Sequence, residues 1–196
     1  SGAITLATSN LLVTIGASAG TGITSTSTLT MSGGAIECGV AACIGDIDGA
    51  VSISVAASYI DFGSATWSFG GAWTNATTSA SWDAGTGTVT FDSAAGGTMT
   101  FAGANLSEAE FNNVTFTSSA GTPQTFTMAT RGLRWLTTLS VVDASSTTAI
   151  VTVDLALGAS ADTPALSVGN GGILTANAST VILSSVTMTG GTSGTI

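Results

Sequence analysis

Hydrophobic and polar residues alternate along most of this chain, in short runs that end at glycine-rich positions. Clear examples are Ser27–Met31, Val51–Val55, Thr88–Phe91, Thr98–Phe101, Val114–Thr117 and Val181–Met188. A two-residue period places the apolar side chains on one face of a strand and the hydroxyls on the other. Strands recur about every 10–15 residues, which leaves too little chain for helices between them. The pattern predicts an all-β protein.

One segment departs from this pattern. Ser107 and Glu110 have the Ser-x-x-Glu spacing of a helix capping box, and Phe111–Val114 follow directly. We expect a single helical turn there.

Two all-β architectures fit the alternation. One is a β-solenoid, a parallel β-helix with coils of roughly 18–25 residues, and the other is a β-sandwich or jelly roll. Loose internal repeats favour the solenoid: Gly2–Ala7 resembles Gly171–Ala176, and Met31–Gly34 resembles Met188–Gly191. We therefore favour a β-solenoid and keep the sandwich as the alternative.

Composition and charge exclude several classes of function. Only 7% of the 196 residues are charged, the formal net charge is -9, and there is no histidine. Arg131 and Arg134 are the only cations, too few to bind nucleic acid or anionic lipid. Imidazole bases and lysine Schiff bases are excluded as well, and no apolar run reaches the roughly 18 residues of a membrane-spanning helix. We expect a protein that is not an enzyme, binds no nucleic acid and does not insert into a membrane.

The central stretch resembles a known group of proteins. Trp67–Asn75, Ala84–Phe91 and Glu110–Phe116 follow the order of the blocks G-x-W-x-N, G-T-G-T-V-x-F and F-x-N-L-x-I. These blocks are typical of secreted, Thr/Gly-rich bacterial and archaeal parallel β-helix surface proteins, which are adhesin-like. The resemblance covers roughly Trp67 to Met188 and implies β-helix coils without catalytic residues.

Length and resemblance together bear on domain organisation. A chain of this size predicts one all-β domain over 1–196, with a weak division near 1–65 and 66–196 where the resemblance begins. The chain starts with Ser1, so we expect either a removed signal peptide or a segment of a longer protein.

The two cysteines are close in sequence. Cys38 and Cys43 bracket four residues, and an exported protein would pair them in a small-loop disulfide. Free thiols are the alternative. A zinc site is disfavoured because the chain has no second cysteine pair and no histidine.

Three tryptophans lie within sixteen residues: Trp67, Trp73 and Trp82. Such residues fill a β core or a subunit contact, and they also form platforms that bind glycans. Core or subunit contact is the favoured interpretation, with a glycan site as the alternative.

Two acidic pairs are candidates for chemistry. Asp46 and Asp48 point to one side of an extended chain and are a candidate for calcium, although the next carboxylate, Asp61, is too far along to complete a local loop. An Asp-Gly turn is the simpler interpretation, and we expect no cofactor beyond this candidate calcium. Glu108 and Glu110 have the residue type of a glycosidase pair but lack positioning cations, so we expect surface charge.

Other surface features are weaker. Four sequons are candidates for N-glycosylation, at Asn75, Asn105, Asn113 and Asn177. Thr-x-Thr runs such as Thr24–Thr28 resemble ice-binding ladders, but the sequence does not repeat them in every coil. We therefore do not favour ice binding.

The two ends of the chain read as ordinary strand and turn, without a capping element. Open β-sheet edges recruit further strands, and a heterologous contact that does not close builds a polymer. We expect a non-enzymatic extracellular structural protein of the cell surface that assembles with copies of itself through β-strand edges into a filament, sheath or surface layer. The alternatives are an adhesin or carbohydrate-binding module with surface glycans as partners, and a viral or phage virion protein.

Overall fold

The structure is a computed structural model of the whole chain. It describes residues 4–6, 12–15, 22–38, 43–54, 58–76, 82–101, 110–118, 124–129, 133–143, 151–154, 165–169, 171–175 and 185–188.

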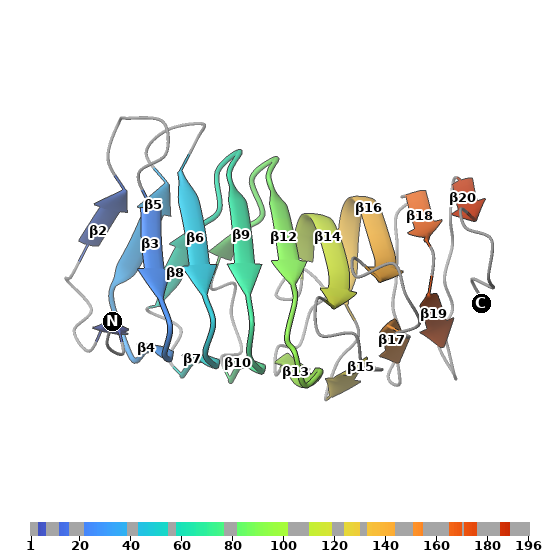
Figure 1. Cartoon of the computed structure of the whole chain (residues 1–196). Helices are drawn as coiled ribbons and strands as arrows, with labels where there is room; N and C mark the ends of the chain where they lie inside the picture. Colours follow the sequence, from blue (N-terminus) through green and yellow to red (C-terminus); the bar gives the residue numbers. More distant parts are fainter. Residues whose placement is uncertain are drawn as a thin grey trace.

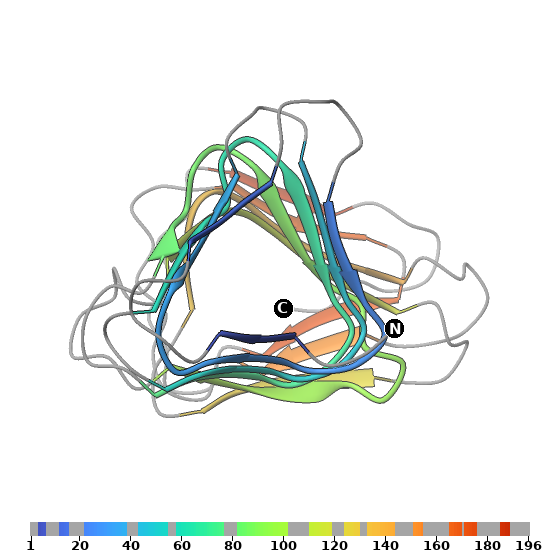
Figure 2. The ribbon, with the colours of Figure 1, turned by 90° about the vertical axis from the view of Figure 1, so that its left-hand side faces the viewer.

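The strands form three parallel sheets that wrap around one interior with a triangular outline (Figures 1 and 2). The first sheet contains β1 (Ile4–Leu6), β4 (Leu29–Met31), β7 (Val51–Ile53), β10 (Trp73–Asn75), β13 (Gly97–Phe101), β15 (Gln124–Ala129), β17 (Val151–Asp154) and β19 (Gly172–Thr175). The second contains β2 (Leu12–Ile15), β5 (Ala35–Cys38), β8 (Tyr59–Asp61) and β11 (Trp82–Asp83). The third contains β3 (Gly22–Ser25), β6 (Ile44–Ile47), β9 (Thr66–Phe69), β12 (Thr88–Phe91), β14 (Glu110–Ser118), β16 (Arg134–Asp143), β18 (Ala165–Val168) and β20 (Ser185–Met188).

Successive strands of each sheet come from successive turns of the chain, so the fold is the β-solenoid that the sequence predicts. Gly22, Ile44, Thr66 and Thr88 occupy equivalent positions 22 residues apart. All pairings of the described strands are parallel, whereas a sandwich or jelly roll is built from antiparallel strands. The stack also continues across residues 65 and 66, because β9 pairs with both β6 and β12.

Alternation sorts the side chains as expected. In β4, β7 and β12 the apolar residues are buried and the hydroxyl residues between them are half-buried on the outer face. Because the strands are parallel and in register, each inward position stacks on its equivalent in the next turn. One such column runs Trp67, Val89, Val114, Leu139, Leu166, and its neighbour runs Phe69, Phe91, Phe116, Val141, Val168, all of them buried.

The predicted helical turn is wrong at Glu110, which begins the nine-residue strand β14. Its parallel pairing with β12 and β16 outweighs the capping-box signal, because tertiary pairing overrides local propensity. Ser107 and Glu108 lie outside the described residues. Within the described part of the chain, the structure holds no helix long and apolar enough to span a membrane.

Candidate functional site

The outer face of the third sheet carries the most regular arrangement of polar side chains in the described structure. On β9, β12, β14, β16, β18 and β20 two outward positions per strand stack into two columns, which we call the hydroxyl face. The first column is Thr66, Thr88, Asn113, Thr138, Ala165, Ser185, and the second is Ser68, Thr90, Thr115, Ser140, Ser167, Thr187. Ten of these twelve residues are Thr or Ser, and none is charged.

A β-bulge keeps these columns aligned. The pairing of β14 with β16 shifts between Phe111 and Asn113, where β16 contains an extra residue. The bulge lies before the two columns begin, and on its exposed side Thr137 Oγ1 donates a hydrogen bond to Asn112 Oδ1 (2.8 Å). The Thr-x-Thr motif itself is not repeated in every coil, since only β12 carries threonine at both positions (Thr88 and Thr90), but serine and threonine together keep the two columns in register.

Two side chains of this face donate hydrogen bonds to other described residues. Ser68 Oγ donates to Asp92 Oδ2 (2.8 Å), and Asn113 Nδ2 donates to the carbonyl of Gly87 (3.3 Å). For the remaining nine hydroxyl residues, the described part of the chain provides no hydrogen-bond partner.

The second sheet carries an acidic column. Glu37, Asp61 and Asp83 follow one another in register on β5, β8 and β11. Asp61 Oδ1 and Asp83 Oδ1 accept hydrogen bonds from the amides of Gly63 (2.7 Å) and Gly85 (2.9 Å). Both glycines have positive φ (57° and 55°), so these aspartates stabilise two stacked turns. Desolvation, and then the charges of Asp61, Asp83 and Glu37, raise the pKa of the Tyr59 phenol.

The calcium candidates lie at the end of the third sheet nearest the N-terminus. Asp46 is half-buried on the outer face of β6, and Asp48 is exposed just after it. Desolvation and the charges of Asp48 and Asp92 raise the pKa of Asp46. Among the described residues, no three carboxylates or thiolates come close enough together to hold a metal ion. Glu110 lies in β14 opposite Arg134 in the backbone register, and Arg131 is outside the described residues.

The tryptophan cluster is interior. Trp67 and Trp73 are 0% exposed, and Trp67 Nε1 donates to the carbonyl of Phe62 (3.3 Å). A glycan or another subunit cannot reach these two indoles. The prediction of a core position is therefore confirmed for Trp67 and Trp73, and the glycan site and the subunit contact are wrong for them. Parallel stacking of in-register strands places them in the aromatic core. Trp82 lies in β11, and its side chain is outside the described residues.

Sequon residues fall at different places. Asn75 is fully buried in β10. The prediction that this residue is a glycosylation site is therefore wrong for the folded protein. Asn113 is half-buried, and its side-chain amide donates to the chain itself. Asn105 and Asn177 lie outside the described residues.

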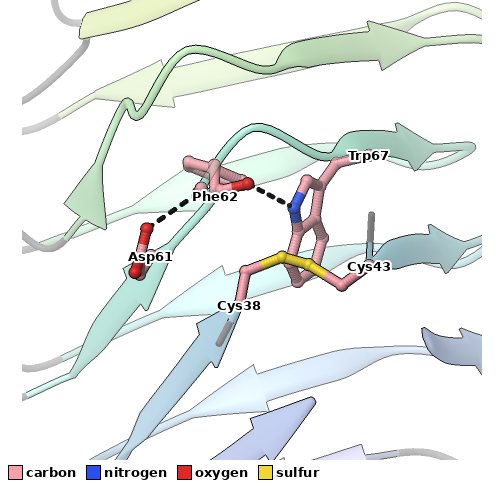
Figure 3. Close-up of a disulfide and its surroundings, with 6 residues drawn as sticks. Cys38, Cys43, Asp61, Phe62 and Trp67 are labelled. Carbon is pink, nitrogen blue, oxygen red and sulfur yellow. Dashed lines mark hydrogen bonds between the residues drawn. A yellow bond between two sulfur atoms is a disulfide. The ribbon is translucent and has the colours of Figure 1, made fainter. Parts of the chain in front are cut away.

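Cys38 at the end of β5 and Cys43 just before β6 form a disulfide (Figure 3). It closes the corner between the second and third sheets, near Gly63 and its stacked turn. Both cysteines are buried.

We expect the double variant Cys38→Ala/Cys43→Ala to be about 2 kcal/mol less stable than the oxidised wild type, because it loses the constraint on the unfolded chain. Alanine avoids placing a hydroxyl in this buried corner. Urea unfolding of the variant and of the wild type with and without reductant tests this. Equal midpoints for all three samples would contradict it.

The end strands of the described stack expose apolar side chains. By register, Val186 and Met188 of β20 continue the inward columns of Leu166 and Val168, and they are 48% and 46% exposed. At the opposite end, Ile4 of β1 and Ile23 of β3 are only partly buried against the core. β1, β3, β19 and β20 each pair on one side only.

Comparisons of this chain with protein-family models, with curated proteins and with solved structures found no match.

Proposed function

We propose that this protein is a non-enzymatic structural subunit that stacks end to end with copies of itself into an extracellular filament, sheath or surface layer. The inward apolar positions at the two ends of the described stack carry the proposal, because they are exposed at one end and only partly buried at the other. In the middle of the solenoid each turn covers the apolar side chains of its neighbour, and Val168, for example, is fully buried. Val186 and Met188 lack such a cover.

A second copy supplies a matching cover. Its first turn presents Ile4 and Ile23, partly exposed apolar residues at inward positions of the first and third sheets. Docking β3 of one copy beside β20 of the next would continue the third sheet by main-chain hydrogen bonds, with the apolar columns setting the register. The two contacting surfaces differ, so the contact does not close and builds a linear polymer.

One other feature supports an extracellular location. A disulfide such as Cys38–Cys43 forms and persists in oxidising compartments, which include the outside of the cell. The alternative of an adhesin with a tryptophan glycan platform loses support from the burial of Trp67 and Trp73.

We expect the wild type to form filaments by electron microscopy, and Val186→Lys/Met188→Lys to remain monomeric by light scattering. Two charges would be buried without partners at the contact. The matched control is Ser185→Lys/Thr187→Lys on the same strand, which places both charges on the outer face and should still assemble. Assembly of the wild type should vary little with salt, because few charges take part. A wild type that stays monomeric at high concentration, or equal assembly of both variants, would refute the proposal.

A further inference from the structure

The hydroxyl face has the geometry of a rigid two-dimensional lattice. Neighbouring parallel strands lie about 4.8 Å apart, and alternate residues along a strand lie roughly 6.6 Å apart. The two columns run through six consecutive strands without a break in register. The face therefore repeats one pair of outward positions six times at fixed spacings, and ten of the twelve positions hold Thr or Ser.

The layer beneath the face holds it in place. The inward residues of β9, β12, β14, β16 and β18 that alternate with it are buried to 3% exposure or less. Phe69, Phe91 and Phe116 stack there with ring centroids 5.8 and 5.1 Å apart. Densely packed side chains of this kind restrict motion, so the strands that carry the outer hydroxyls are fixed in position before any ligand arrives.

The chemistry of the face excludes most ligands. The twelve residues include no charge to bind a mineral ion, a phosphate or an acidic polymer, and no aromatic ring on which a sugar could stack. Two carboxylates lie at one edge of the face, Asp46 in register with Ser68 and Asp92 hydrogen-bonded to it. They offer hydroxyls, each able to donate once and accept twice, together with the methyl groups of six threonines. Nine of the ten hydroxyls have no hydrogen-bond partner in the described part of the chain.

We propose that the hydroxyl face binds the surface of ice. An ice surface is itself a rigid repeat of water molecules that offers both donors and acceptors. Hydroxyls held at fixed positions on a rigid sheet can join such a lattice at a small entropic cost, while the threonine methyls order the water between them. One hydroxyl contributes little, but the contacts act together because they share one spacing.

The test compares two single substitutions with the same chemistry. Thr90→Tyr places a bulky side chain on the second of the six strands of the hydroxyl face, between Ser68 and Thr115. Thr74→Tyr places it on the outer face of the first sheet, in a single column of hydroxyls between Ser52 and Thr100 that has no second column beside it on β4, β7 and β10. Both threonines are half-buried and outward, and tyrosine is a good strand former, so circular dichroism should show both variants folded.

We expect the wild type and Thr74→Tyr to be incorporated into a slowly growing ice crystal and to lower the freezing point below the melting point. Thr90→Tyr should lose most of both effects. Exclusion of the wild type from ice, or equal losses in the two variants, would overturn the proposal. Ice binding does not require end-to-end stacking, so the monomeric variant Val186→Lys/Met188→Lys should retain it, and the two proposals fail separately.

Discussion

Gly45→Val is expected to lower the free energy of unfolding by about 3 kcal/mol, because it overpacks a filled core. Gly45 points inward from β6 and lies in register with Trp67 of β9. A Cβ atom on Gly45 would lie 1.9 Å from Cε3 of the indole. Trp67 is fully buried and hydrogen-bonded, so it has no free space into which it can move. Urea unfolding followed by tryptophan fluorescence measures the loss.

A second glycine provides the control for Gly45→Val. Gly97 in β13 has ordinary backbone angles, and a Cβ there would meet its nearest neighbour, Met99 Cε, at 3.5 Å. Gly97→Ala should leave the stability unchanged or raise it by about 0.5–1 kcal/mol, since glycine weakens a strand interior. The penalty of Gly45→Val should also shrink in a Trp67→Leu background, because the two residues share one space. An equal penalty in both backgrounds would contradict the packing argument.

The pairing of Gly45 with Trp67 illustrates what the sequence predicts and what it does not. The two-residue period identifies strands such as Thr88–Phe91 with their correct faces, because alternation depends only on neighbouring residues. The contact between residues 45 and 67 depends on the length of one turn. That length is 22 residues between β3 and β12 and then changes, since Thr88 pairs with Asn113 and Thr138 with Ala165.

A repeat that reveals this period is present but was not recognised in the sequence. Asp61-Phe62-Gly63 and Asp83-Ala84-Gly85 lie 22 residues apart, and each is followed by an alternating run that ends at Phe69 or Phe91. In the structure these segments form the stacked turns and the strands β9 and β12. The similarity of Gly2–Ala7 to Gly171–Ala176 is of a different kind. Ile4 lies in register with the buried Leu29 and therefore faces inward. Ile173 is half-buried next to the buried Leu174 and therefore faces outward, so the two segments do not occupy equivalent positions.

The hydroxyl face was missed for the same reason. Thr66, Thr88, Asn113 and Thr138 are not evenly spaced in the sequence, so a search for a fixed Thr-x-Thr period does not align them. The turns between strands absorb the differences in length, and parallel pairing restores the register. For Trp67 and Trp73 the sequence favours a core or subunit contact but keeps a glycan platform as the alternative, because a core position and an exposed platform can have the same local pattern.

Phe91→Ala is expected to cost about 3–5 kcal/mol of stability, the range for removing a buried aromatic side chain. Its ring lies among four others, with centroids 5.8 Å from Phe69, 6.2 Å from Trp73, 6.0 Å from Phe111 and 5.1 Å from Phe116. These rings come from β9, β10 and β14, so the cavity would loosen both the first and the third sheet. Phe91→Leu retains most of the volume and should cost less. Thr88→Ala, an outward neighbour on β12, should change stability by no more than about 0.5 kcal/mol. Calorimetric melting of the three variants tests this order. An equal loss of stability in Phe91→Ala and Thr88→Ala would show that the packed rings around Phe91 do not stabilise the solenoid.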